Sequence, residues 1–521
     1  MGESGLGASR YALVEARAGA LRGVVADGIY SFKGVPYGEP TGGERRFLPP
    51  VEAARWSGVK DALEYGPDAP QGGSRDQSAA LQNNLAREPA EDCLVLNVWT
   101  PDLGDGARRP VMFWCHGGGF VSGSGSGALY SGEQLARRGD VVVVSINHRL
   151  GALGFLSLAD VDPAAGSSVN LGMLDIVLAL EWVRDNIETF GGDPGNVMIF
   201  GESGGGRKVT ALLAMPLAQG LFHRAAIQSG PAVFLNDREA VRRLAELLLA
   251  ELAVTREPLR SLQARPLAEI LEAQAVVLRR VGRSAEGLAQ TFAPVVDGEI
   301  LPHHPFDPEA PAISDHIPVI VGYNRTEATL FMGRDPDLLE LDDAGLARRI
   351  DSALGDEADR VLEIYKKAHP EATCSDLLAY ILTGLRRYPI DSIKLAERKS
   401  LRGQAPAYLY TLTYRTPAAR GALRTPHALE IPFVFDNVEG SRRFVGGGDA
   451  PVRLADAMSG AWIAFAHTGS PHHEGIPEWP AYSLQKREQM IFDVPCRIES
   501  DFNAAERAAW EPLLYATPEA R

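Results

Sequence analysis

One serine set between glycines constrains the fold of this chain more than any other feature. The segment Gly201-Glu-Ser-Gly-Gly205 follows an apolar stretch at 197–200 and precedes a segment typical of a helix. A serine on so tight a turn from strand to helix has a strained backbone that only small neighbours permit. Such a turn exposes the hydroxyl of Ser203 and directs the N–H of Gly204 toward the same space. Because both flanks fit, we expect a strand, this turn and then a helix.

Buried strands and helices alternate around this turn. Residues 110–115 and 141–146 are apolar at almost every position, as strands covered on both faces must be. Residues 175–190 carry apolar side chains at helical spacing, and residues 317–323 form another apolar stretch of strand length. This alternation predicts the α/β class, with a large, mostly parallel central sheet flanked by helices.

Three segments interrupt the alternation. Residues 66–92 are mostly polar residues, glycine and proline, and long loops of this kind are often functional. Residues 236–290 are helical and charged in pattern, and residues 330–400 are also mainly helical. Since no repeat or linker divides the chain, we expect one domain over residues 1–521, with these segments as insertions around the active site.

A glycine-rich loop follows the predicted strand at 110–115. It begins with His116-Gly-Gly-Gly-Phe120 and continues with further glycines to Gly127. Glycines allow several backbone N–H groups to point in one direction, which is what the negative oxygen of a tetrahedral intermediate requires. The position of this loop, after a buried strand and before the serine turn, favours an oxyanion hole over a merely flexible loop.

A serine nucleophile needs a base, and the base needs an orienting carboxylate. Of the eleven histidines, His427 lies in a polar loop just before an apolar run, a position that suits a catalytic group. Glu327 comes soon after the strand at 317–323, and functional residues of open α/β sheets gather at the carboxyl ends of strands. The order Ser203, Glu327, His427 matches the nucleophile–acid–base order that accompanies this serine motif. Spacing alone does not settle the choice of histidine.

Composition argues against several kinds of partner. The 521 residues carry a net charge of −15, which disfavours non-specific binding to nucleic acid or to a membrane surface. No apolar run reaches 18 residues, and the first residues lack the pattern of a secretory signal. The four scattered cysteines are expected to be reduced and structural, which favours a cytoplasmic location. The oligomeric state stays open.

Several motifs spread over most of the chain carry a resemblance to a known family. They are Phe32-Lys-Gly-Val-Pro-Tyr37 with Arg46-Phe47, Glu91-Asp-Cys-Leu-Val-Leu-Asn-Val98, His116-Gly-Gly-Gly-Phe120, Gly201-Glu-Ser-Gly-Gly205, Gln228-Ser-Gly230, Gly322-Tyr-Asn-Arg-Thr-Glu327 and His427-Ala-Leu-Glu-Ile-Pro-Phe433. On these motifs the chain resembles the type-B carboxylesterase family, which includes bacterial para-nitrobenzyl esterases and the animal cholinesterases.

The resemblance implies an α/β-hydrolase fold and a serine carboxylesterase acting on small-molecule esters. It implies Ser203 as nucleophile, Glu327 as acid and His427 as base, with no metal and no cofactor. The same three residues could instead hydrolyse a carbamate or an activated amide. A non-catalytic binding protein of this fold is a further alternative, but such proteins lose a triad residue and this chain retains all three.

The resemblance also implies the residues around the triad. The N–H groups of Gly118, Gly119 and Gly204 would hold the oxyanion. Glu202 would be the acidic neighbour of the nucleophile, and Ser229 would be a buried hydroxyl that supports Glu327.

The chain departs from the family pattern near residues 66–92. Ala69 stands close to where the usual disulfide partner of Cys93 would lie, so we expect no disulfide there. The segment 66–92 has no aromatic residue, and Tyr65 lies only at its edge. Because cation–π binding needs an aromatic face, choline esters are not expected to be preferred substrates.

A second departure follows the serine. Gly204, Arg207 and Lys208 stand where many members have alanine, a neutral residue and serine. We expect Lys208 to be buried and therefore paired with a carboxylate, with Asp175 or Glu202 as candidates. Its role would then be structural, since His427 already serves as the base.

Overall fold

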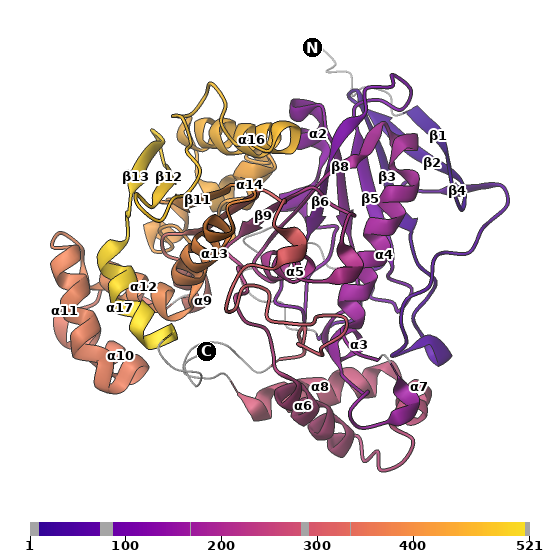
Figure 1. Cartoon of the computed structure of the whole chain (residues 1–521), viewed down its shortest axis with the longest axis horizontal. Helices are drawn as coiled ribbons and strands as arrows, with labels where there is room; N and C mark the ends of the chain where they lie inside the picture. Colours follow the sequence, from indigo (N-terminus) through magenta and orange to yellow (C-terminus); the bar gives the residue numbers. More distant parts are fainter. Residues whose placement is uncertain (1–9, 73–86, 167, 283–290, 334, 516–521) are drawn as a thin grey trace, which may run out of the picture.

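One mixed β-sheet forms the centre of the molecule (Figure 1). The computed structural model describes residues 10–72, 87–166, 168–282, 291–333 and 335–515. Within these residues the sheet order is β1-β2-β3-β5-β7-β6-β8-β9-β10-β11-β12-β13, and β4 pairs with β2. The strands are β1 (Arg10–Ala16), β2 (Gly19–Ala26), β3 (Ile29–Pro36), β4 (Val59–Asp61), β5 (Val95–Thr100), β6 (Arg109–Cys115), β7 (Val142–Ile146), β8 (Gly192–Glu202), β9 (Arg224–Gln228), β10 (Val319–Asn324), β11 (Ala407–Leu412), β12 (Glu488–Phe492) and β13 (Arg497–Ser500).

The middle of the sheet is parallel and its edges are antiparallel. Strands β7, β6, β8, β9, β10, β11 and β12 pair in parallel, whereas β1, β2, β3, β5 and β13 pair with antiparallel neighbours. Every residue of β6 and β7 is buried, as the continuous apolar pattern predicts. The expected α/β architecture with a mostly parallel sheet is therefore confirmed.

Helices cover both faces of this sheet because alternate side chains of each strand point to opposite sides. In β6, Val111 and Phe113 join one core, and Met112 and Trp114 join the other. The first core includes helices α4 (Leu171–Asn186), α5 (Gly204–Leu212) and α13 (Tyr388–Arg402). The second includes α2 (Glu133–Gly139), α14 (Ile431–Val434) and α16 (Ala450–Thr468).

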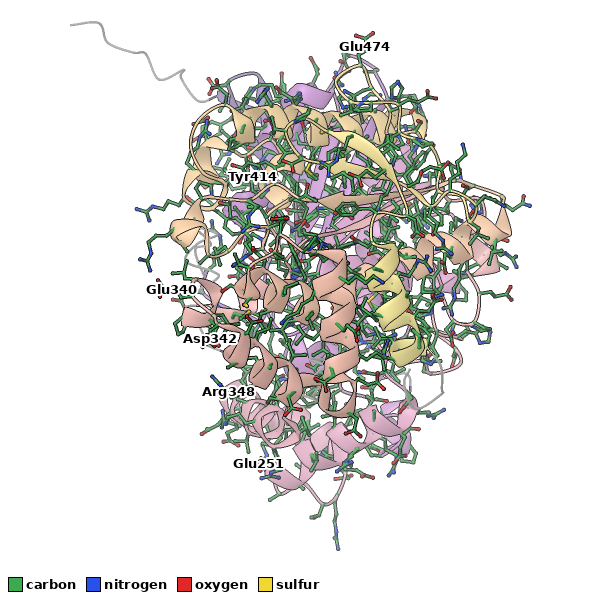
Figure 2. The ribbon with its side chains drawn as sticks, turned by 90° about the vertical axis from the view of Figure 1, so that its left-hand side faces the viewer. Glu251, Glu340, Asp342, Arg348, Tyr414 and Glu474 are labelled. Atoms are coloured by element: carbon green, nitrogen blue, oxygen red, sulfur yellow. The ribbon has the colours of Figure 1, made fainter. Side chains whose placement is uncertain are left out.

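The remaining helices either extend the first core or form a cluster of their own. Helices α6 (Arg238–Glu251) and α8 (Leu267–Val281) pack together, with α7 (Pro258–Ala264) between them in sequence, and their buried apolar side chains belong to the first core. A third apolar cluster joins α10 (Asp343–Leu354), α11 (Ala358–Ala368), α12 (Cys374–Leu385) and α17 (Ala504–Tyr515). The short helices are α3 (Gly151–Phe155), α9 (Ala328–Met332) and α15 (Arg442–Val445). Figure 2 shows that Glu251 of α6 and Glu474, in the loop after α16, lie at opposite ends of the molecule.

Two of the three segments expected as insertions contain helices of these groups. The segment 236–290 is described as far as residue 282 and contains α6, α7 and α8. Residues 73–86 of the segment 66–92 lie outside the described residues. Within 330–400, α13 packs on β10 and β11 and so belongs to the layer of the sheet, whereas α10 to α12 stand apart from it.

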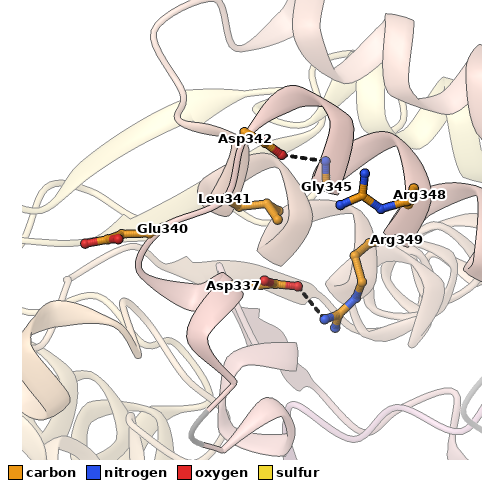
Figure 3. A pocket seen from close by; sticks show the side chains of 7 residues that line it. All are labelled: Asp337, Glu340, Leu341, Asp342, Gly345, Arg348 and Arg349. Carbon is orange, nitrogen blue, oxygen red and sulfur yellow. Dashed lines mark hydrogen bonds and ion pairs between the residues drawn. The ribbon is translucent and has the colours of Figure 1, made fainter.

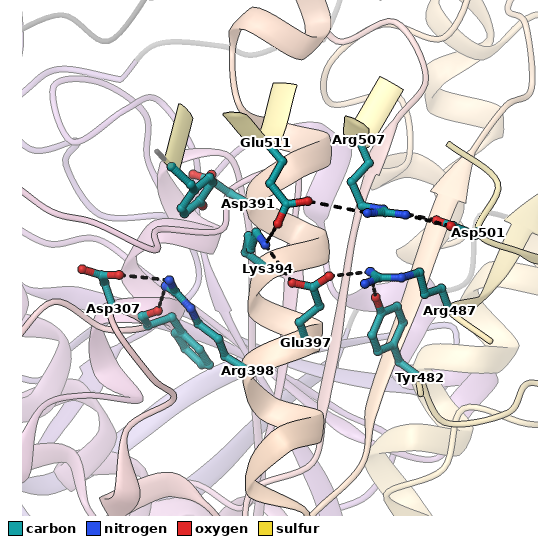
Figure 4. A network of polar contacts seen from close by, with 12 residues as sticks. Asp307, Asp391, Lys394, Glu397, Arg398, Tyr482, Arg487, Asp501, Arg507 and Glu511 are labelled. Carbon is teal, nitrogen blue, oxygen red and sulfur yellow. Dashed lines mark hydrogen bonds and ion pairs between the residues drawn. The ribbon is translucent and has the colours of Figure 1, made fainter. Parts of the chain in front are cut away.

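Ion pairs link helix α17 to the rest of the molecule (Figure 4). Lys394 of α13 forms ion pairs with Glu397, at 3.0 Å, and with Glu511 of α17. Arg507 of α17 pairs with Asp501 at 2.8 Å. This network connects α17 to α13, the helix that lies directly on the sheet.

Candidate active site

The turn at Ser203 has the strained geometry that the sequence predicts. Strand β8 ends at Glu202, α5 begins at Gly204, and Ser203 between them has φ 57° and ψ −121°. The N–H of Ser203 donates to the carbonyl oxygen of Gln228 at 2.9 Å, which ties the turn to β9. Ser203 is partly exposed while its neighbours in sequence are buried. The turn therefore presents a single hydroxyl at the carboxyl end of β8.

Glycines allow the start of α5 to pack directly on backbone. A Cβ atom added to Gly205 would lie 2.0 Å from the carbonyl oxygen of Cys115 at the end of β6. A Cβ atom added to Gly230 would lie 2.0 Å from the carbonyl oxygen of Ser203. Neither position has room for a side chain. Gly205 packs on the end of β6, and Gly230, which follows β9, packs on Ser203 at the end of β8. The carboxyl ends of these three strands therefore lie close together at the serine.

The predicted oxyanion loop also touches the start of α5. Gly118 and Gly119 have φ values of 90° and 61°, which favour glycine. The N–H groups of Val121 and Ser122 donate to the carbonyl oxygen of Gly118, at 3.2 and 3.1 Å, and close the loop into a turn. A Cβ atom added to Gly204 would lie 2.6 Å from the backbone nitrogen of Gly119. The structure thus brings Gly118, Gly119 and Gly204 together.

His427 and Glu327 meet in the interior, 100 residues apart in sequence. The Nδ1 atom of His427 lies 2.5 Å from Oε2 of Glu327, and both residues are buried. The other oxygen, Oε1, accepts a hydrogen bond from the backbone N–H of Asn324 at 2.7 Å. Glu327 lies between β10 and α9, and His427 lies in the loop before α14. Both oxygens of the carboxylate are therefore engaged, which fixes the imidazole.

The second ring nitrogen of His427 faces Glu202. Its Nε2 atom lies 3.0 Å from Oε1 of Glu202, which is buried beside the serine. Burial and the nearby charge of Glu327 raise the pKa of Glu202 well above its ordinary value. In the described part of the chain no hydrogen bond joins Ser203 to His427. Catalytic hydrogen bonds are often long in sites without substrate.

A third buried carboxylate, Glu430, lies in the same cluster. Asn324 Nδ2 donates to Oε2 of Glu430 at 2.5 Å. Burial, together with the charges of Glu202 and Glu327, raises the pKa of Glu430 to about 8. Glu430 has no predicted role, although it lies three positions after His427 within the motif His427-Ala-Leu-Glu-Ile-Pro-Phe433. That spacing is the signal that could have identified it.

The expected support of Glu327 by Ser229 is not formed. Ser229 is fully buried and has φ 47°, but its Oγ atom has no hydrogen-bond partner among the described residues. The bond that Glu327 needs comes instead from the backbone of Asn324. A backbone donor is set by the chain direction at the end of β10, which a motif does not reveal.

Aromatic rings that no sequence motif indicates cover His427. The rings of Phe331 and Tyr388 lie with centroids 5.0 and 5.1 Å from the imidazole. The guanidinium of Arg386 lies 3.9 Å from the centroid of the Phe331 ring. These residues come from the helical segment 330–400, so only the tertiary structure places them at the site.

Lys208 is buried as predicted, but the predicted carboxylate partner is wrong. Its side chain is fully buried, and Nζ donates to the carbonyl oxygen of His116 at 2.8 Å. Asp175 pairs with Arg149 at 2.6 Å, and Glu202 faces the histidine. Burial lowers the pKa of Lys208 from 10.5 to about 7. A backbone carbonyl thus takes the place of the expected carboxylate.

The predicted absence of a disulfide at Cys93 is confirmed. Cys93 and Ala69 are both buried, and all four cysteines are free. Tyr65, the aromatic residue at the edge of the segment 66–92, already has Lys33 at 4.8 Å and Arg87 at 4.6 Å from its ring centroid. These cations of the chain occupy the surroundings of that ring.

Charged side chains line a hollow beside α10 (Figure 3). Asp337 and Arg349 form an ion pair across it at 2.6 Å, and Asp342 Oδ1 accepts from the N–H of Gly345. Two of its carboxylates, Asp337 and Asp342, are therefore engaged by groups of the same wall, and none of its lining residues belongs to the cluster around His427.

Among the helices that the structure describes, none has the length and apolar character needed to cross a membrane.

Comparisons with known proteins agree with this geometry. The family model described as "Carboxylesterase family" matches residues 10–510. The para-nitrobenzyl esterase of Bacillus subtilis (strain 168) is 36% identical over 95% of this chain and 97% of its own length. The phenmedipham hydrolase of Pseudarthrobacter oxydans is 34% identical over 89% of this chain and 92% of its own length.

Solved structures give the same result. The crystal structure of a carboxylesterase from Geobacillus stearothermophilus is 37% identical, covers 96% of this chain and 99% of its own, and superimposes with a TM-score of 0.82. A second structure, titled PNB esterase, has a TM-score of 0.82 at 34% identity. From its sequence match and its fold, the chain belongs to the carboxylesterase family and is a carboxylic ester hydrolase of the α/β-hydrolase type.

Proposed function

We propose that the chain is a serine carboxylesterase that forms an acyl-enzyme on Ser203, with His427 as general base and acid and Glu327 as the orienting carboxylate. The observation that carries the proposal is the buried contact of 2.5 Å between His427 Nδ1 and Glu327 Oε2. It fixes an imidazole that also contacts Glu202, the residue directly before the partly exposed Ser203 of the strained turn. Membership of the carboxylesterase family supports the same reaction.

In the first step, Ser203 Oγ forms a bond to the ester carbonyl carbon. Its proton passes to Nε2 of His427, the ring nitrogen that Glu327 does not contact. The N–H groups of Gly118, Gly119 and Gly204 hold the oxygen that becomes negative. The bond from carbon to the alcohol oxygen then breaks, and the leaving alcohol takes the proton from His427.

Water completes the reaction by the same route. His427 takes a proton from water, the resulting hydroxide attacks the acyl carbon, and the bond to Ser203 Oγ breaks. Ser203 regains its proton from His427, and the carboxylic acid leaves. The carboxylate of Glu327, which contacts Nδ1 of His427, stabilises the imidazolium that forms twice in each cycle. The reaction needs no electron transfer, so these residues account for each bond made and broken.

The substrate is proposed to be a small-molecule ester. Hydrolysis of a carbamate or an activated amide by the same residues is the second possibility. We further propose a cytoplasmic location, supported by the four free cysteines. We also propose a single domain, supported by the continuous sheet that joins strands from Arg10 to Ser500.

Substitution of Ser203 by alanine tests the proposal. The variant should retain the wild-type melting temperature and lose on the order of a thousandfold or more in kcat. Matched ester, carbamate and anilide substrates with the same acyl part, assayed with the wild type, should show the highest kcat/KM for the ester. A folded Ser203→Ala variant with near-wild-type turnover would overturn the proposed nucleophile. A higher kcat/KM for the carbamate or the anilide than for the ester would show that the proposed substrate class is wrong.

A further inference from the structure

Lys208 is buried where a charged amine lowers stability. Its side chain has no exposed surface, and in the described part of the chain no carboxylate pairs with it. An unpaired buried ammonium is unfavourable because it loses its hydration. A lysine that opposes folding in this way, one turn after the proposed nucleophile, points to a role in the reaction.

The contacts of the amine connect it to the oxyanion loop. Nζ donates to the carbonyl oxygen of His116 at 2.8 Å, and the ring of Phe120 has its centroid 5.6 Å from Nζ. His116 and Phe120 bound the three glycines of the loop. The bonded carbonyl belongs to the peptide that enters Gly117, directly before the proposed oxyanion donors Gly118 and Gly119.

The other groups around the amine are neutral. Burial and the nearby charge of Lys208 lower the pKa of His116 and of His148 well below the ordinary value. The two imidazole rings stack with centroids 5.0 Å apart, and each Nδ1 donates to a backbone carbonyl. Burial raises the pKa of the Cys115 thiol to about 12, so this group is also uncharged near neutral pH. The ammonium is therefore not neutralised by its surroundings.

We propose that Lys208 is a positioning residue of the oxyanion hole: its ammonium holds the peptide of His116 in place and adds positive charge behind the N–H groups that bind the oxyanion. This inference rests on the proposed function, because it assumes that Ser203 generates an oxyanion at this loop. A fixed charge in a dry site stabilises the transition state more than the ground state. The effect is therefore expected in kcat and not in KM.

Three variants separate charge from hydrogen bonding. Lys208→Met removes both, Lys208→Gln keeps a donor without the charge, and Lys208→Arg keeps the charge. Lys399→Met is the matched control, because Lys399 is also a buried lysine bonded to backbone carbonyls, those of Ser314 and Asp315, both at 2.7 Å. Lys399 lies on α13, outside the cluster around Ser203.

The readouts are kcat, KM and inhibition by a trifluoromethyl ketone that adds to Ser203 and mimics the oxyanion. Lys208→Met should lower kcat by about tenfold and lower the affinity for the ketone by a similar factor. KM should stay within about twofold of the wild-type value. Lys208→Gln should recover part of this loss and Lys208→Arg more of it, whereas Lys399→Met should retain the wild-type kcat. The ratio of wild-type to Lys208→Met kcat should fall as pH rises past 7, because the wild-type amine then loses its proton.

Two results would overturn the inference. The first is a folded Lys208→Met or Lys208→Gln variant with wild-type kcat and wild-type affinity for the ketone. The second is an equal loss of kcat in Lys208→Met and Lys399→Met, which would mean that burial of a lysine matters only for the fold. If Lys208→Met does not fold, Lys208→Gln decides by the same measurements. An active Ser203→Ala variant would instead overturn the proposed function itself.

Discussion

The two sides of the serine turn have opposite electrostatics. On one side three buried carboxyl groups, Glu202, Glu327 and Glu430, surround His427, and no lysine or arginine forms an ion pair with them among the described residues. On the other side the ammonium of Lys208 lies among neutral imidazoles without a carboxylate.

This contrast matches the two charges of the proposed reaction. The carboxylate side, formed by Glu202, Glu327 and Glu430, would suit the imidazolium proposed to form on His427. The lysine side, formed by Lys208 and the imidazoles around it, would suit the oxyanion proposed to form on the substrate. On both sides burial disfavours the charged form of a side chain: it raises the pKa of Glu202 and of Glu430 and lowers the pKa of Lys208.

Removing the charge of Glu327 should have the largest effect. In Glu327→Gln the amide replaces the carboxylate that orients Nδ1 of His427, so the imidazolium loses its partner. We expect kcat to fall by about 10³–10⁴-fold with KM little changed. Steady-state kinetics on the folded variant measures this, and Glu474→Gln, an exposed position, is the control. A loss below tenfold would mean that the carboxylate side does not drive the reaction.

Displacing the loop on the lysine side should have the next largest effect. A Cβ atom added to Gly118 would lie 2.1 Å from the carbonyl oxygen of Ser122, and the φ of 90° at this position already disfavours a side chain. Gly118→Ala should therefore shift an oxyanion donor and lower kcat by about 10²-fold, the range seen when one donor is lost. Gly104→Ala, which has open space and no positive φ, is the control. Unchanged kcat in Gly118→Ala would show that the loop tolerates a side chain there.

The carboxylate side should make stability fall as pH rises. The pKa of Glu430 is raised from 4.5 to about 8, so between these values the unfolded chain has lost a proton that the folded chain keeps. The wild type should therefore lose stability from pH 5 to pH 8, on the order of 4 kcal/mol for a full shift of this size. Urea unfolding at both pH values measures the loss, and Glu430→Gln should show less of it. Equal pH dependence in the two proteins would contradict the assignment.

The lysine side should make stability rise with pH, the opposite of the carboxylate side. The pKa of Lys208 is lowered from 10.5 to about 7, so between these values the unfolded chain holds a proton that the folded chain has released. Wild-type stability should gain a contribution as pH rises from 7 toward 10, on the order of a few kcal/mol. Lys208→Met should lack this gain, and Lys367→Met, at an exposed position, should keep it. Urea unfolding at pH 7 and pH 9.5 provides the comparison.

The smallest effect concerns the thiol on the lysine side. Cys115 is buried and burial raises its pKa to about 12, so it should resist iodoacetamide in the native protein at pH 8. The partly exposed Cys374 and Cys496 should react first, with activity and melting temperature unchanged. Mass spectrometry of the labelled peptides identifies the sites. Early labelling of Cys115, or loss of activity with dithiothreitol, would contradict the prediction.

Much of the site could be predicted from local patterns. The motif around Ser203 predicted a strand, a strained turn and a helix, and the structure has all three. The continuous apolar stretches predicted the buried strands β6, β7 and β10. Strand β13 and helix α17 were not predicted, because a short edge strand with exposed residues and a helix with an internal Pro512 give weak periodic signals.

The partners of buried polar groups could not be predicted in the same way. The sequence led us to expect a carboxylate for Lys208 and a contact from Ser229 to Glu327. The structure instead pairs Lys208 with the carbonyl of His116, and Glu327 with the N–H of Asn324. Both true partners are backbone atoms, which every residue possesses and no motif marks.

The class of fold, the serine turn and the family could be predicted from the sequence, because each depends on local residue types in a fixed order. The surroundings of Ser203, Glu327 and His427 follow only from how the whole chain packs. Tyr388, Glu430 and Lys208 reach the site from three different parts of the chain, and each position depends on how the sheet and its helices pack. The physical reason is that burial and electrostatic neighbours arise from packing across long sequence separations, whereas turns and strands arise from neighbours along the chain.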